Sequence, residues 1–118
     1  MSRRRVPSDA LDESDDTLTL LDGERFTGIA EDRFADGGIR FETEYRNGIL
    51  DGTSRTYWPS GDVRQETWYD YGIRLRQRSW HESGTAREDA VFDEHGLKHH
   101  YKWAEDGSAV DTYHRAGS

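Results

Sequence analysis

The sequence contains no cysteine, and its 118 residues include only two prolines and two lysines. The lack of cysteine excludes disulfide bonds and thiolate chemistry. No apolar run approaches the roughly 20 residues that a membrane-spanning helix needs. No apolar segment follows the basic first residues, so a secretory signal is not predicted. We therefore expect a cytoplasmic protein, and we do not expect it to bind membranes.

Apolar residues are also scarce, at 32% against 34% for charged residues. A thick globular core needs more than this. Four Trp, six Tyr and four Phe nevertheless supply large surfaces for burial, so a thin sheet held by aromatic side chains fits both observations. The net charge of -8 repels phosphate backbones. Direct nucleic-acid binding is therefore not expected, whereas a basic partner would be attracted.

What the sequence does contain is an approximate repeat of 23 residues. One aromatic column shares this spacing: Phe34, Tyr57, Trp80 and Trp103. A glycine column keeps it too: Gly38, Gly61, Gly84 and Gly107. A third column consists of Tyr45, Trp68, Val91 and His114. Self-similarity at a fixed period indicates stacked copies of one small structural unit.

Two kinds of glycine-marked turn alternate along the repeats, which suits β-hairpins and leaves no room for helices of average length. Asn47-Gly48 and Asp22-Gly23 are hairpin turn signals. The sequence thus predicts an all-β fold over residues 17–118, an elongated single-layer antiparallel sheet of stacked β-hairpin repeats. Residues 1–16 contain many acids and little to bury, so we expect a disordered acidic N-terminal tail there.

The segment YRNGILDGTSRTYWPSGDVRQETWYDYG resembles the MORN repeat in its degenerate bacterial variant. Its recurring positions are Tyr45, Gly48, Gly52, Tyr57, Trp58 and Gly61. The likeness spans about 17–117 and implies a sheet of repeated hairpins. Many bacterial chains of this kind are identified as YwqK-type antitoxins, so the resemblance also implies a toxin-neutralising role. The later repeats depart from the pattern, because Leu75 and Lys98 stand near the place that Gly52 occupies in this one.

The strict period favours the interpretation that the aromatic columns pack within the protein as a ladder. The alternative is an exposed platform on which a ligand stacks. If Ser60-Gly61 is a two-residue turn, Trp58 and Tyr69 face away from the ladder, where exposed aromatic side chains favour interfaces. The carboxylates form a polar stripe that we expect to meet arginine or lysine on a partner. The candidate partner-binding residues are Trp58, Tyr69, Tyr71, Glu42, Glu66 and Glu88.

No motif indicates catalysis, a metal site or a cofactor. Neither a G-x-S-x-G elbow nor a P-loop occurs, and Gly96 separates His95 from His99, whose spacing would suit a metal only on a helix. We therefore expect a non-enzymatic protein-binding module without a cofactor, antitoxin-like or immunity-like, that neutralises a basic partner such as a toxin. A structural scaffold or a self-assembling module remains the alternative, including a homodimer formed through open sheet edges.

Overall fold

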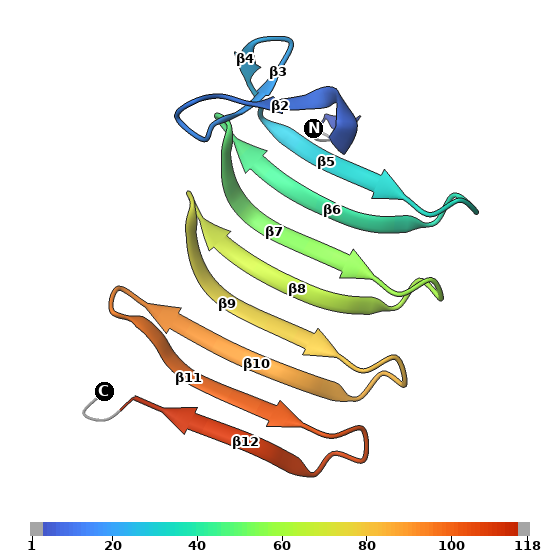
Figure 1. The fold of residues 1–118 in the computed structure, drawn as a ribbon, viewed down its shortest axis with the longest axis vertical. Coiled ribbons are helices and arrows are strands. Elements are labelled where there is room, and N and C mark those ends of the chain that lie inside the picture. Colours follow the sequence, from blue (N-terminus) through green and yellow to red (C-terminus); the bar gives the residue numbers. More distant parts are fainter. Residues whose placement is uncertain (1–3, 116–118) are drawn as a thin grey trace.

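The structure is a computed structural model that describes residues 4–115 and consists almost entirely of β-strands (Figure 1). The strands are β1 (Arg5–Pro7), β2 (Leu11–Glu13), β3 (Thr19–Leu21), β4 (Glu24–Arg25), β5 (Gly28–Arg33), β6 (Ile39–Arg46), β7 (Ile49–Tyr57), β8 (Val63–Asp70), β9 (Ile73–Trp80), β10 (Ala86–Asp93), β11 (Gly96–Trp103) and β12 (Ala109–His114). One 3-10 turn, Ser8–Ala10, joins β1 to β2. Within residues 4–115 no helix is long and apolar enough to cross a bilayer.

Nine strands form one sheet in the order β1-β5-β6-β7-β8-β9-β10-β11-β12. Every pair from β5 to β12 is antiparallel, and β1 joins the edge in parallel beside β5. Figure 1 shows the strands as successive curved rungs, with β2, β3 and β4 gathered into a small second sheet at the β5 end. The predicted all-β fold of stacked hairpins in a single layer is confirmed, with β1 as a parallel addition.

The predicted disordered tail is not what the structure shows for residues 4–16. Strand β1 pairs with β5, and β2 pairs with β3. The physical reason is that the segment carries apolar side chains in the right places: Val6 is 8% exposed, and Leu11 packs against the same cluster. The acids of this segment, Asp9, Asp12 and Glu13 among them, are exposed and do not prevent this burial. Residues 1–3 of the predicted tail lie outside the described residues.

Burial is concentrated at the β5 end of the long sheet. Val6, Phe26 and Ala30 form a cluster that Leu11, Leu21 and Tyr45 partly cover. Along the remaining strands the buried positions are small residues in the middle of a strand: Thr43, Thr67, Ser79 and Ala90. A single layer has no opposing layer to bury large side chains, so only small ones beneath larger neighbours are excluded from water.

The turns repeat with closely similar hydrogen bonding. In the turn after β7, Trp58 N donates to Asp62 O and Gly61 N donates to Trp58 O. The same two bonds recur at His81 and Ala104, and the residues at the position of Gly61 all have positive φ, from +88° to +97°. The first copy is shifted, because there the equivalent bonds start from Phe34 and the positive φ falls on Gly37, not Gly38.

The shift means that the first repeat spacing is 24 residues and not 23. Strand β7 has nine residues, whereas β9 and β11 have eight. The extra residue lies in a bulge where Thr43 pairs with Ser54 but Tyr45 pairs with Leu50. Gly52 sits in this bulge with φ +101°. Phe34 is consequently the structural counterpart of Trp58, and the predicted column of Phe34 with Tyr57 is wrong by one position.

Candidate partner-binding surface

Strand alternation divides the long sheet into two faces. The small-residue face carries Thr43, Thr67, Ser79 and Ala90, which are linked across the sheet by register. The opposite face, here called the aromatic face, carries Tyr57, Trp68, Trp80, Tyr101 and Trp103. On this face Arg55 lies opposite Glu66, and Thr53 lies opposite Trp68. A register shift beyond Thr56 places Tyr57 opposite Val63 and not opposite Arg64.

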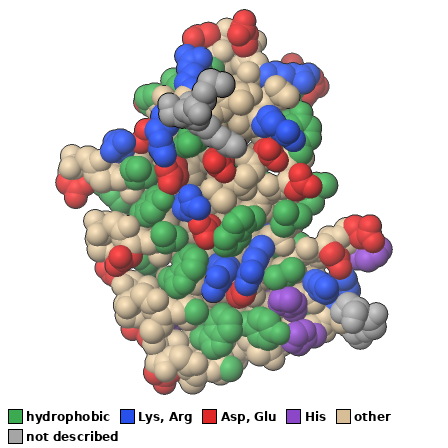
Figure 2. Space-filling model, turned by 180° about the vertical axis from the view of Figure 1, so that it is seen from behind, with side chains coloured by type: hydrophobic (Ala, Val, Ile, Leu, Met, Phe, Trp, Pro, Cys, Tyr) green, Lys and Arg blue, Asp and Glu red, His purple; other side chains and the backbone are tan. Residues whose placement is uncertain are grey.

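A charge row crosses the aromatic face. Its members are directly opposite one another on successive strands: Glu42, Arg55, Glu66, Arg78 and Asp89. Arg55 pairs with Glu66 on one side and lies 4.0 Å from Glu42 on the other. The row alternates in sign, so its carboxylates are largely neutralised within the molecule. Figure 2, seen from behind Figure 1, shows basic, acidic and hydrophobic side chains interspersed over the sheet.

Glu42 is the most enclosed member of this row, with 13% of its side chain exposed. Arg5 Nη1 donates to its Oε2 at 2.9 Å, and the Tyr57 hydroxyl donates to its Oε1 at 2.5 Å. Partial burial raises the pKa of Glu42, but these two hydrogen bonds and the charges of Arg5 and Arg55 outweigh it and lower the pKa. Burial and the bond to Glu42 raise the pKa of Tyr57 to about 12.

A second row runs beside the charge row near the turns. Tyr57, Trp80 and Trp103 end strands β7, β9 and β11, and arginines occupy bulges on the strands between them. Arg64 is the unpaired residue between Val63 and Gln65, and Arg87 is its counterpart between Ala86 and Glu88. We call Tyr57, Trp80 and Trp103 the ring row. The two arginine side chains contact groups on the other side of the sheet: Arg64 lies over the Trp58 ring, and Arg87 lines a hollow with Glu88 and Lys102. Neither Arg64 nor Arg87 forms an ion pair with another described residue.

The ring row does not form the continuous ladder of touching rings that the sequence predicts. Ring contacts between described residues gather at the two ends of the sheet, where Phe26 meets Tyr45 and where Tyr101 stacks on Trp103 at 5.9 Å. Between them the rings contact guanidinium groups: Arg78 lies 5.4 Å from the Trp80 ring centre. Antiparallel order explains this, because two copies of a column are separated by an intervening strand.

The end of the aromatic face at β11 and β12 holds a compact group of rings. The Tyr101 hydroxyl and His114 Nε2 are 2.7 Å apart, and His99 lies 5.2 Å from the Tyr101 ring and 5.6 Å from the His114 ring. No group of three or more His, Asp or Glu side chains placed to hold a metal ion occurs within residues 4–115.

The six predicted partner-binding residues do not share one surface. Glu42 and Glu66 lie on the aromatic face, in the charge row. Tyr69 and Glu88 lie on the small-residue face, where His100 Nε2 is 3.0 Å from Glu88. Gly52 opposes Tyr69 there, which leaves that ring half-buried.

The remaining two, Trp58 and Tyr71, stand in turns. Arg64 lies 4.8 Å from the Trp58 ring centre, and the buried Trp58 Nε1 has no hydrogen-bond partner in the described part of the chain. Tyr71 is 41% exposed, and the Arg46 guanidinium group lies 4.9 Å from the centre of its ring. Its backbone has φ +40° and its N–H donates to Asp51.

Sequence reasoning missed the arginines at the bulges, Arg64 and Arg87. A signal for them was present, because an arginine stands three residues after the turn glycine in three successive units, at Arg40, Arg64 and Arg87. The one-residue difference between the first two units hid this spacing. Glu42 and Glu88 stand two periods of 23 residues apart in the sequence, which makes them look equivalent. Register instead aligns Glu42 with Glu66 and Asp89.

Unpaired acidic side chains are found chiefly in the turns. Asp62, Glu82 and Glu105 stand in or beside the turns that follow β7, β9 and β11, and each is exposed or half-exposed. Figure 2 shows acidic side chains at the projecting margin of the sheet. The net charge of -8 is therefore carried mostly by the margins and the N-terminal hairpins, not by the aromatic face.

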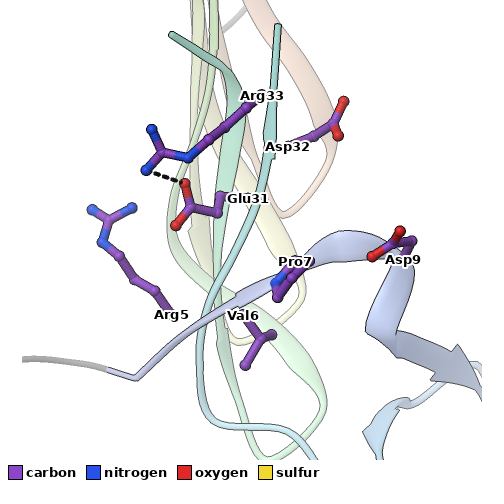
Figure 3. A pocket seen from close by; sticks show the side chains of 7 residues that line it. All are labelled: Arg5, Val6, Pro7, Asp9, Glu31, Asp32 and Arg33. Carbon is purple, nitrogen blue, oxygen red and sulfur yellow. Dashed lines mark ion pairs between the residues drawn. The ribbon is translucent and has the colours of Figure 1, made fainter. Parts of the chain in front are cut away.

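A cavity of about 310 Å³ lies at the β1–β5 edge. Figure 3 shows Arg5 and Arg33 on the side of the Glu31 carboxylate, with Asp9 and Asp32 directed elsewhere. Arg33 pairs with Glu31 at 2.9 Å. This arrangement has one carboxylate beside two guanidinium groups and holds no pair of groups poised for acid–base chemistry.

Comparisons with known proteins add little to this picture. No family model matches the sequence, and no curated protein matches it. A solved structure with partial likeness is a crystal structure of a GtfA/B complex bound to UDP and GlcNAc. It is 11% identical with a TM-score of 0.39, and the match covers 75% of this chain and 24% of that chain. At these values the likeness carries no argument about function.

Proposed function

We propose that this chain is a non-enzymatic protein-binding module. The observation that carries the proposal is the uncovered aromatic face, on which Trp, Tyr and Arg side chains are held in rows by strand pairing. These three residue types dominate binding energy at protein interfaces. Their positions are fixed by the backbone ladder, so a partner would meet side chains that are already ordered.

An antitoxin-like or immunity-like role is the sharper form of the proposal. The resemblance to MORN-type repeats supports it, and so does the acidic margin formed by turns that recur with the repeat. Glu42 and Glu66 are neutralised by Arg5 and Arg55, so a basic partner would meet the exposed turn carboxylates such as Asp62 and Glu82 instead. Inhibition would follow from steric occlusion with complementary charge.

The test is capture followed by titration. The tagged full chain is used at low salt to capture proteins from its native host, and any candidate is then purified and titrated against the chain by calorimetry. Trp68→Ala on the aromatic face should weaken binding by about tenfold or more, whereas Tyr113→Ala on the small-residue face should not. Failure of every candidate to give saturable binding would overturn the proposed function.

A self-assembling scaffold is the second candidate, and one observation favours it. All six residues of β12 are exposed, and its outer edge pairs with no described strand. Val110 and Tyr113 are 66% and 45% exposed. An open edge of this kind is a template for strand pairing between copies. Sedimentation over a wide concentration range tests this, because a monomer at all concentrations leaves the scaffold without support.

A further inference from the structure

The ring row alternates with smaller apolar residues on the strands between. A smaller residue is paired with each ring: Val63 with Tyr57, Ala86 with Trp80, and Ala109 with Trp103. Directly paired residues share a face, so these side chains form one line across strands β7 to β12. Neighbouring strands are about 4.8 Å apart, so rings recur about every 9.6 Å with a gap midway between them. The line starts with a ring on β7 and ends with a small residue on β12.

This line is complementary to its own reverse. A twofold axis parallel to the strands, passing between β9 and β10, would place β9 over β10 of a second copy, β8 over its β11 and β7 over its β12. Each ring then faces a smaller residue: Trp80 faces the partner's Ala86, Trp103 faces the partner's Val63, and Tyr57 faces the partner's Ala109. Side chains of two sheets packed about 10 Å apart interdigitate in this way.

The charge row fits the same symmetry. It lies two residues from the rings along β7 and β9, and the axis brings Arg78 opposite the partner's Asp89 on both sides. Farther from the axis, Glu66 faces the partner's Tyr101 and Arg55 faces the partner's Thr112, so like charges of this row do not meet. Arg78 has 40% of its side chain exposed and lies 4.0 Å from Asp89 of its own chain. Its guanidinium group can therefore bridge two carboxylates.

We propose that the aromatic face binds the same face of a second copy of this chain, as a closed twofold dimer with interdigitated ring rows. The inference rests on the proposed protein-binding function and names the partner of this face. A third row, from Thr53 to His114, brings Trp68 over the partner's His99. Six strands and three rows cover roughly 29 Å by 20 Å, on the order of 600 Å² per copy, against about 800 Å² in a standard interface. This area fits a dimer that exchanges with its monomer.

Sedimentation of the full chain over roughly 1 µM to 1 mM tests the proposal. The acidic turns of both copies lie at the same end of this dimer, so the salt concentration is 0.15 M, where the screening length is about 8 Å. We expect dimers and no larger species. Arg78→Asp and Asp89→Arg each place like charges together at both central pairs, and each should weaken self-association by about tenfold or more. An equal mixture of these two variants restores opposite charges at both pairs and should form heterodimers about as tightly as the unmodified chain forms its dimers.

The matched control uses Arg40 and Asp32, which form an ion pair on the small-residue face. Arg40→Asp and Asp32→Arg change the net charge by the same amounts and should dimerise like the unmodified chain. Ala86→Trp fills the gap beside the axis and should prevent dimers, while circular dichroism confirms that each variant keeps its strands.

A monomer throughout the concentration range would overturn the proposal. So would dimers that neither central charge variant weakens, or a mixture of the two variants that stays monomeric. Dimers lost instead in Val110→Lys/Tyr113→Lys would assign association to the open edge of β12 and would also overturn it. If the chain is monomeric while a captured protein partner still binds saturably, this inference fails and the proposed function stands.

Discussion

The Tyr57 hydroxyl donates a hydrogen bond of 2.5 Å to the Glu42 carboxylate across the β6–β7 pair. This bond joins the ring row to the charge row. It holds the Tyr57 ring against the sheet and keeps Glu42 from presenting its charge to a partner. Arg5, on the parallel strand β1, completes the arrangement from the other side of Glu42.

The first prediction concerns high pH. The pKa of Tyr57 is raised to about 12 in the folded protein, from a usual value of 10.0. The stability that this shift contributes is fully present below pH 10 and is lost as the pH rises through 12. Ultraviolet titration should show one tyrosine ionising late. Tyr57→Phe should remove that step and flatten the dependence of unfolding free energy on pH in this window. A titration unchanged by Tyr57→Phe would contradict the assignment.

The second prediction concerns the charge row. Glu42→Gln removes the anion that Arg5 and Tyr57 bind, and should lower the free energy of unfolding by about 1–2 kcal/mol. Glu105→Gln is the matched control, because its exposed side chain makes no such contacts. Denaturant unfolding measures both. Equal effects of the two substitutions would mean that the enclosed row contributes nothing particular to stability.

The third prediction concerns the bulge in β7. A Cβ added at Gly52 would overlap Glu44 Oε2, the atom that accepts a 2.6 Å hydrogen bond from Thr53 N. Gly84 has a similar φ but open space around it. Gly52→Ala should therefore destabilise the protein by about 1–2 kcal/mol more than Gly84→Ala, measured by thermal unfolding. Combining Gly52→Ala with Glu44→Ala should recover part of the loss, and no recovery would rule out the Glu44 contact as its cause.

The fourth prediction concerns acid and the last strand. Asp93 at the end of β10 accepts hydrogen bonds from Arg115 and from His95 N, which lower its pKa to about 2 from 3.8. This contribution to stability is present above pH 3.8 and is lost as the pH falls through 2. Amide exchange in β12, corrected for the intrinsic pH dependence of exchange, should speed up over that range, and Asp93→Asn should give the faster exchange already above pH 3.8. Exchange that Asp93→Asn does not change would show that this contact does not fasten β12.

The fold could be predicted because its signals are local. Asn47-Gly48 forms the expected hairpin turn with φ of +51° and +79°, and Gly61, Gly84 and Gly107 take the positive φ expected of them. The N-terminal segment could not be predicted, since its placement depends on Val6 reaching a cluster built by Phe26 and Ala30, some twenty residues away. By composition alone, with many acids and few apolar residues, this segment is predicted to be a solvated tail.

The candidate surface was harder to predict than the fold. Side-chain direction reverses with a shift of one residue, and the extra residue at Gly52 introduces such a shift between the first two units. Glu42 and Glu88 were therefore assigned to one stripe although they lie on opposite faces. The pairing of carboxylates with Arg55 and Arg76 also escaped the sequence, because cross-strand partners depend on register.

The cluster of Val6, Phe26 and Ala30 lies at one end of the sheet, so the two ends of the sheet differ in stability. Each strand of the long sheet packs chiefly against its neighbours, and β12 has neither a buried residue nor a second sheet beside it. Unfolding of the sheet should begin at the last hairpin and proceed strand by strand toward the N-terminal cluster. A pulling force applied at residue 115 would thus peel hairpins away one at a time, and the β5 end would be the last to yield.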